Sequence, residues 1–278
     1  DPGAAPGAGL NVGIQRMVRD GRFDAGRRRW LAGVAETTAL AVWPGVGVSA
    51  DAAVATVAAA AAELDGLVAR FGALPANGEV RRVFAAGPPA GVLLAAVAPQ
   101  KLLGWPMKLP AQARAWMGEP LADLPYLGRL AGRGSTMPLE ALLELQPDLV
   151  LDSGTVDATY LSGTERLHRQ TGLPCVLVQG GLADSARQLR AVGALLGESA
   201  RVERLAAFAD EVLRLAAQVT RDVSAEQRPR VYLARGVAGL ETARIGAINA
   251  EVIELAGGRN VAVESGRGGL MQVSLEQL

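Results

Sequence analysis

The chain has 278 residues, half of them apolar, and its 28 basic and 28 acidic residues give a formal net charge of zero. A surface that binds nucleic acid needs an excess of basic residues to neutralise phosphates, and the even spread of charge argues against one. At this length and apolar content the chain can bury one large core or two smaller ones, so we expect two lobes.

The first 78 residues are rich in alanine and predict helices, and no motif is found in them. The opening DPGAAPGAG has neither the basic region nor the apolar region of a secretory signal, so we expect no signal peptide within this chain. It is similar to the spacer that remains after a leader is removed. Two apolar stretches follow, 31–48 and 51–69, but Glu36, Pro44 and Glu63 argue against membrane spans there.

Short apolar runs alternate with helical patterns from Arg82 onward. An apolar run bounded by turn residues predicts a buried strand, and apolar residues at three- and four-residue spacing predict a helix. Strands that alternate with helices indicate βαβ units and a parallel sheet. The expected strands are 83–87, 102–106, 148–152 and 174–179, and the expected helices are 90–98, 138–146 and 156–172.

Residues 183–223 contain no strand signal and predict two helices, 183–197 and 198–223. At ~1.5 Å per residue, the second would be on the order of 35–40 Å long. We therefore predict an α/β fold of two lobes bridged by one long helix, with the second lobe incomplete. The expected strands of that lobe are 230–235 and 260–263, with a helix at 246–258 and another that opens at 274. The expected divisions are a helical segment of unknown role at 1–78, a first lobe at 79–182, a helical segment with the interlobe helix at 183–226, and a partial second lobe at 227–278.

The run Asp152–Thr155 reads D-S-G-T, which is the loop that carries the catalytic carboxylate in aspartic proteases. Those enzymes need a second such loop, because two carboxylates must share a proton. No second D-[ST]-G occurs here, and the surrounding pattern is α/β. In an open parallel sheet, ligands bind beyond the carboxyl ends of the strands, so this loop is expected to contact a ligand instead.

Other candidates for chemistry are weak. His168 lies near the end of a polar helix, where it is a favourable partner for the helix dipole. Cys175 lies in an apolar run and reads as buried packing. The glycine-rich segment 128–137 contains neither G-x-G-x-x-G nor a P-loop lysine, and no G-x-S-x-G elbow is present. With one histidine and one cysteine, we predict no metal site and no catalytic residue.

Polar and aromatic residues gather at the predicted strand ends. A cleft between two lobes lined by aromatics and arginines suits a bulky anionic or chelated ligand. The two lobes also share a short sequence similarity, a helix start of the form [PS]-L-E that contains Glu140 in one lobe and Glu276 in the other. The strand-end set is Pro88, Pro89, Trp105, Thr155, Val156, Asp157, Tyr160, Arg235, Glu241, Thr242, Arg244 and Asn249.

The order of the motifs over residues 80–278 resembles the class III substrate-binding proteins of ABC importers, which bind iron siderophores, haem and cobalamin. The motifs are RVFAAGPPAGVLLAAVAPQKLLGWP, LPYLGRL, LEALLELQPDLVLD, QTGLPCVLV, the long helix, RPRVYLARG, GAINAEVIELAGGRNVA and VSLEQL. The family fold is two Rossmann-like lobes bridged by one rigid helix, so the resemblance implies that architecture. Family members continue past the point where this chain ends, and residues 1–78 have no counterpart in the usual plan.

The resemblance also implies residue roles. Glu140 and Glu276 would be the paired surface glutamates that dock on arginines of the membrane permease. Trp105 and Tyr160 would cover apolar parts of the ligand, and the arginines would pair with its acidic groups. The implied ligand contacts are Pro88, Trp105, Thr155, Asp157, Tyr160, Arg235, Glu241, Arg244 and Asn249.

Taken together, these features lead to the hypothesis of a binding protein that catalyses nothing. It would deliver a metal chelate, a ferric siderophore above all, to an ABC importer, and it would work in the periplasm or on a lipid anchor outside the cytoplasmic membrane. No intrinsic cofactor is expected. Haem, cobalamin and an oxyanion such as molybdate are the alternative ligands. An α/β enzyme with Asp152 or Asp157 as its base is the alternative of another class.

Overall fold

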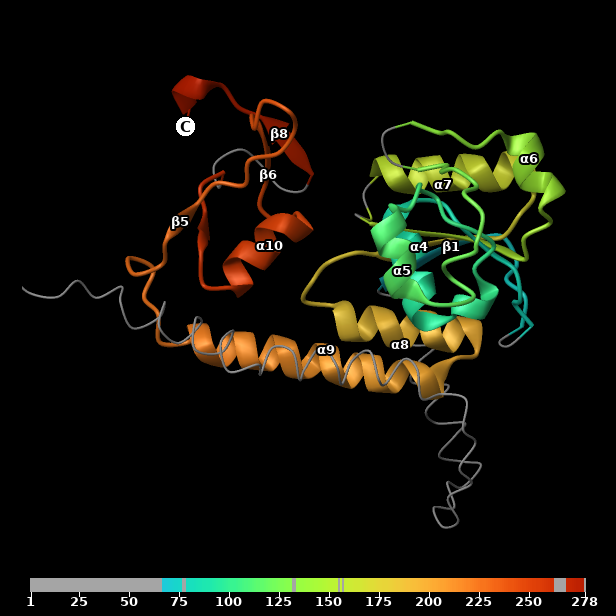
Figure 1. Ribbon diagram of the computed structural model, residues 1–278, viewed down its shortest axis with the longest axis horizontal. Coiled ribbons are helices and arrows are strands. Elements are labelled where there is room, and N and C mark those ends of the chain that lie inside the picture. Colours follow the sequence, from blue (N-terminus) through green and yellow to red (C-terminus); the bar gives the residue numbers. More distant parts are fainter. Residues whose placement is uncertain are drawn as a thin grey trace, which may run out of the picture. The chain divides into compact units, whose positions relative to one another are not determined.

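The computed structural model describes residues 67–76, 79–131, 134–154, 156, 158–262 and 269–277. The first lobe is built on one four-stranded sheet, with strand order β1-β4-β3-β2 (Figure 1). Neighbours β2, β3 and β4 run parallel, as the alternation of strands and helices predicts, and β1 lies antiparallel to β4 at the edge. The strands are β1 (Val68–Phe71), β2 (Val83–Ala85), β3 (Leu149–Gly154) and β4 (Cys175–Gln179).

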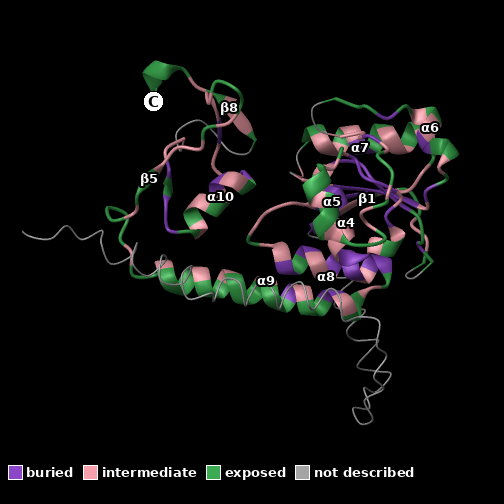
Figure 2. Ribbon diagram, in the orientation of Figure 1, coloured by how far each residue is buried: buried purple, intermediate pink, exposed green. Residues whose placement is uncertain are grey.

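Helices cover both faces of this sheet, with α7 on one side and α8 on the other (Figure 1). They explain why β3 and β4 are nearly continuous apolar runs, since a parallel sheet is buried on both faces. The buried strands contrast with the partly exposed helices around them (Figure 2). The helices are α4 (Pro88–Val97), the 3-10 turn η1 (Pro99–Lys101), α5 (Ala111–Met117), α6 (Leu139–Glu144), α7 (Ala158–Thr171) and α8 (Ser185–Leu196).

The alternation of side chains along β3 divides the core in two. Leu149 and Leu151 belong to the cluster that includes residues of α4 and α8. Val150 belongs to the other cluster, which includes Leu142 of α6 and Leu167 of α7. Because successive side chains of a strand point to opposite faces, Asp152 lies on the face of Val150, toward α7.

Two expectations about strands are corrected. Residues 68–71 form β1 and not part of a helical segment, so the first lobe begins before residue 79. Gly72 ends this strand at φ +83°, and its missing side chain leaves room for the His168 ring, whose Nδ1 lies 2.8 Å from the Leu173 carbonyl oxygen. Residues 102–106 form only isolated bridges, at Leu102 and Trp105, because Gly104 and Pro106 interrupt the ladder.

The predicted long helix is confirmed as α9 (Ser199–Thr220), which packs on α8 through its first turns. Gly193 makes this contact close, since a β-carbon there would lie 2.7 Å from a methyl group of Val202. Arg190 of α8 reaches Glu203 at 2.8 Å and Asp210 at 3.0 Å on α9. The hydrogen bonds that Arg190 donates to the Glu203 carboxylate hold the pKa of Arg190 above its ordinary value.

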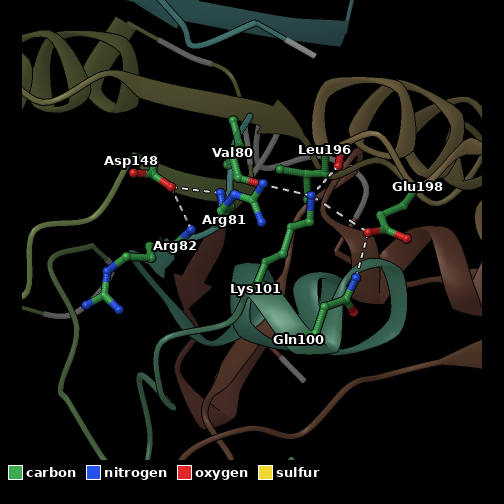
Figure 3. A network of polar contacts seen from close by, with 8 residues as sticks. All are labelled: Val80, Arg81, Arg82, Gln100, Lys101, Asp148, Leu196 and Glu198. Atoms are coloured by element: carbon green, nitrogen blue, oxygen red, sulfur yellow. Dashed lines mark hydrogen bonds and ion pairs between the residues drawn. The ribbon is translucent and has the colours of Figure 1, made fainter. Parts of the chain in front are cut away.

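A polar network fixes the start of α9 to the first lobe (Figure 3). Lys101 Nζ donates to the carbonyl oxygens of Val80 (2.9 Å) and Leu196 (2.6 Å) and lies 3.7 Å from Glu198. Gln100 Nε2 donates to the same Glu198 carboxylate at 2.6 Å. The ammonium group thus satisfies a carbonyl at the end of α8, where a positive charge is favourable.

In the region from residue 228 to 277, the described residues (228–262 and 269–277) form two small two-stranded ladders and one α-helix. The α/β class holds here, but the expected strand 230–235 is only two residues long, and the expected helix at 274 is a 3-10 turn. The core of this region is small and consists of alanines, with Leu233 and Leu270 packed against them. The elements are β5 (Arg230–Val231), β6 (Glu241–Ala243), α10 (Ile248–Leu255), β7 (Arg259–Asn260), β8 (Leu270–Gln272) and η2 (Leu275–Gln277).

Candidate ligand-binding site

A cavity of about 480 Å³ lies between α7 and the sheet of the first lobe, at the carboxyl ends of β2 and β3. Its walls combine apolar and polar side chains, which suits a small-molecule site. Its position is where open parallel sheets bind ligands. It is lined by Ala86, Leu130, Ala131, Ser135, Met137, Leu139, Val150, Asp152, Thr159, Tyr160, Gly163, Thr164, Arg166, Leu167, Gln170 and Val176.

Asp152 is a buried ionisable group of this cavity, with 7% of its surface exposed. Its Oδ1 accepts a hydrogen bond of 2.9 Å from the amide of Ser153, the next residue. Burial raises the pKa of the Asp152 carboxyl to about 6, and the Ser153 amide opposes this in part. The Asp152 carboxylate therefore lines the cavity, and the described residues compensate its negative charge only weakly.

Leu130, Ala131, Ser135 and Met137 close one side of the cavity, and hydrogen bonds hold this wall in place. The amides of Leu130 and Ala131 donate to the Ala86 carbonyl oxygen at 2.8 and 3.0 Å. Ser135 Oγ donates toward the carbonyl oxygens of Arg129 and Met137, at 3.2 and 3.0 Å. These bonds tie the wall to the end of β2, so the cavity is shaped before any ligand arrives.

The first turns of α7 form the opposite wall. Thr164 is buried, and its hydroxyl donates to the Tyr160 carbonyl oxygen at 2.9 Å, which leaves its methyl group available for packing. Tyr160 is half-buried, whereas Arg166 is exposed. Gly163 leaves open space, because a β-carbon at this position would meet nothing within 4 Å.

The predicted ligand contacts of the first lobe separate into three groups. Tyr160 lines the cavity, and Pro88 begins the helix beside Gly87, whose β-carbon position is 3.5 Å from Asp152 Oδ1. Thr155 and Asp157 lie outside the described residues. The prediction for Trp105 is corrected, because its side chain is 1% exposed and its indole N–H donates to the Leu121 carbonyl oxygen at 2.8 Å. An indole packed in this way belongs to the core.

Two of the predicted ligand contacts in the second region, Arg235 and Glu241, bond to each other. Arg235 Nε lies 3.4 Å from the Glu241 carboxylate, and the two residues also exchange backbone hydrogen bonds. Arg244 is half-buried, and its Nε is buried without a hydrogen-bond partner among the described residues. Asn249 is a half-buried residue in the first turn of α10. None of these four lines the first-lobe cavity.

The two predicted docking glutamates are both exposed. Glu140 lies in the first turn of α6, where a negative charge is favourable, and Glu276 lies in η2. A hydrogen bond from the Ser274 side chain lowers the pKa of Glu276. Both carboxylates therefore face solvent, and their docking role stays a prediction.

The sequence placed Asp152 at the end of a strand, but the predicted ligand contacts were the residues that follow it. It also missed Ser135 and Arg166. A signal for Asp152 was present, since it follows Val150 by two residues and so shares a buried face. Ser135 and Arg166 carried no such signal, because their place depends on how the loop and α7 pack.

The described residues contain neither a metal-ligand cluster nor a membrane-spanning helix. Within the described ranges, no group of three or more His, Cys, Asp or Glu side chains lies close enough together to hold a metal ion. None of the helices in that same part of the chain is both long and apolar enough to span a membrane.

Comparison with known proteins gives a family and a fold. A family model described as "Periplasmic binding protein" matches residues 82–278. A search of curated protein sequences gave no match. The motif order noted above and the family model therefore agree over nearly the same stretch of chain.

Several solved structures are similar. An ABC transporter solute binding protein from Sulfurospirillum deleyianum matches with 23% identity and a TM-score of 0.63, covering 73% of this chain and 64% of that one. A molybdate periplasmic binding protein from Haemophilus influenzae matches with 19% identity and a TM-score of 0.55, covering 73% and 66%. A periplasmic heme-binding protein from Roseiflexus matches with 21% identity and a TM-score of 0.52, covering 71% and 72%. At these identities the likeness is one of fold, and the chain spans less than two thirds of the first two relatives.

Proposed function

Because this chain belongs to the periplasmic binding protein family, we propose that it is the substrate-binding protein of an ABC importer and carries a metal chelate, above all a ferric siderophore. The cavity at the carboxyl ends of β2 and β3 is the observation that carries this proposal. Its volume of about 480 Å³ falls in the range of small-molecule sites. The family is one of binding proteins, which agrees with a protein that captures and does not catalyse.

A chelate suits the mixed lining of the cavity. The organic shell of a siderophore presents apolar methylenes together with carbonyl and hydroxyl groups. Apolar walls such as Met137 and Leu167 can contact the former, and Tyr160 and Ser135 can hydrogen-bond the latter. The chelate brings its own oxygen ligands for iron, so the protein recognises the shell and supplies no metal ligand.

Binding is tested by titration of the protein with ferric chelates, haem, cobalamin and molybdate, followed by tryptophan fluorescence. Saturable quenching by a ferric siderophore supports the proposal, and saturation only by haem, cobalamin or molybdate redirects it to that ligand. No response to any member of the panel contradicts it. Because Trp116 is 65% exposed, Trp116→Phe serves as a control for nonspecific quenching.

The place of binding is tested by Tyr160→Ala, which should weaken the affinity for the chelate about tenfold or more. Tyr126→Ala is the matched control, because Tyr126 is an exposed tyrosine of the same lobe that does not line the cavity. Equal effects of the two substitutions would remove the cavity from the proposal.

Delivery is tested in a reconstituted importer. We propose that Glu140 and Glu276 dock on the permease, on the side of the membrane away from the cytoplasm, so their joint replacement by alanine should reduce transport and leave ligand affinity intact. Glu144→Ala is the control, because Glu144 is an exposed glutamate of the same helix as Glu140. Undiminished transport by the double variant would refute the docking role.

A further inference from the structure

Asp152 is a buried carboxylate without a strong partner among the residues that the structure describes. The hydrogen bond that it receives among the described residues comes from the amide of Ser153, the adjacent residue. With 7% of its surface exposed, Asp152 has little access to bulk water. A buried charge of this kind is costly unless it is paired or hydrogen-bonded.

The neighbouring helix start offers Asp152 fewer hydrogen-bond donors than a helix start usually does. Asp152 stands beside Gly87, the residue before α4, and a helix start normally offers free amide N–H groups to an anion. Here the first two residues of the helix are Pro88 and Pro89, which have no N–H.

We propose that the partner of Asp152 is the ligand, and that the ligand presents a protonated amine or guanidinium group to it at the inner end of the cavity. The proposal rests on the function of this cavity as a ligand site and names the chemistry that the site recognises. A cation satisfies the carboxylate through a charge-assisted hydrogen bond, which is stronger than a bond between neutral groups. A neutral or anionic group at this place would leave the carboxylate uncompensated.

The other ionisable groups of the cavity do not take this role. Among the described lining residues, the titratable side chains besides Asp152 are Tyr160 and Arg166, and both lie on α7. Arg166 is exposed, so its charge is screened by water and salt, whereas Asp152 acts in a low-dielectric place. A cationic ligand therefore gains more from Asp152 than it loses to Arg166.

The decisive test compares ligands that differ only in this group. Phenethylamine and its hydroxyl analogue 2-phenylethanol have the same apolar body, and their binding can be followed by chemical-shift changes in NMR spectra. The wild-type protein should bind the amine at least tenfold more tightly than the alcohol. Asp152→Asn keeps the shape of the side chain and removes its charge, so it should bind both compounds equally.

Two results would overturn the inference. One is an Asp152→Asn protein that keeps the preference for the amine, and the other is a wild-type protein that shows no preference. Circular dichroism confirms that the variant is folded, and Asp184→Asn, which changes a carboxylate on the other side of the sheet from this cavity, should retain the preference.

A second pair of compounds separates this inference from the proposed function. A linear ferric trihydroxamate with a terminal amine and its N-acetylated form differ by one positive charge. If phenethylamine shows the Asp152-dependent preference and neither chelate binds, the amine site stands and the siderophore proposal fails. If both chelates bind equally to wild-type protein and to Asp152→Asn, the siderophore proposal stands and the amine site fails.

Discussion

The first lobe and the region from residue 228 to 277 follow the same alternation of strands and helices, yet they bury different cores. The first lobe encloses leucines, valines and Phe84 on both faces of one four-stranded sheet. The other region has two separate two-stranded ladders around Ala243, Ala247 and Ala250. A pattern of elements therefore does not fix stability, because burial of large apolar side chains supplies most of it. The first lobe is accordingly the part that holds a preformed cavity.

The largest effect is expected from Leu151→Ala in β3. Leu151 is fully buried, so the substitution removes apolar burial and leaves a cavity, at a cost of about 3–4 kcal/mol. Urea denaturation followed by circular dichroism measures this loss. A cost below about 1 kcal/mol would contradict a tightly packed first-lobe core.

An effect of opposite sign is expected from Asp152→Asn. The pKa of Asp152 is 3.8 ordinarily and about 6 in the folded protein, so the folded state binds the proton more tightly. The stability that the bound proton provides is present below about pH 4 and is lost as pH rises through about 6. Since that interval corresponds to about 3 kcal/mol, the variant should match wild type near pH 4 and exceed it by up to about 3 kcal/mol at pH 8. Melting temperatures at both pH values test the sign.

A smaller loss is expected from Gly193→Ala at the contact of α8 with α9. A β-carbon there would lie 2.7 Å from a Val202 methyl group, so the helices must separate at a cost of about 1–2 kcal/mol. Gly163→Ala is the matched control, since its β-carbon would meet nothing within 4 Å. The control should stabilise by up to about 1 kcal/mol, because alanine favours the helix. Equal signs for the two variants would argue against close packing of α8 on α9.

The smallest loss of stability is expected from Leu270→Ala in the second region. Leu270 is half-buried against an alanine core and pairs with Ala243, so the substitution should lower the free energy of unfolding by about 1 kcal/mol. Hydrogen exchange of the amide of Ala243 should accelerate about fivefold, with amides of β3 unaffected. Faster exchange in both places would show that the two regions unfold together.

The sequence predicted elements better than it predicted contacts. Long apolar patterns such as 198–223 and the runs that became β3 and β4 were recognised, since burial on both faces leaves a continuous apolar signature. Residues 68–71 were not recognised as β1, because an edge strand among alanines lacks that signature. Trp105 was predicted at a ligand and lies in the core, because the aromatic residue type alone does not distinguish the two places. The cavity depends on the packing of α7 and of the wall formed by residues 130, 131, 135 and 137, which no local pattern encodes.

The anchoring of Lys101 to the start of α9 has a practical consequence for measurements of ligand-induced motion. Its ion pair with Glu198, the residue before α9, and the hydrogen bond of Gln100 to the same carboxylate fix the first turns of α9 to the first lobe. Spin labels on Glu144→Cys and Arg204→Cys would therefore form an internal ruler whose length stays constant when ligand binds. The native Cys175 would not compete for the label, since burial raises the pKa of its thiol to about 12. Distances from either label to a third position then report movement against a fixed frame.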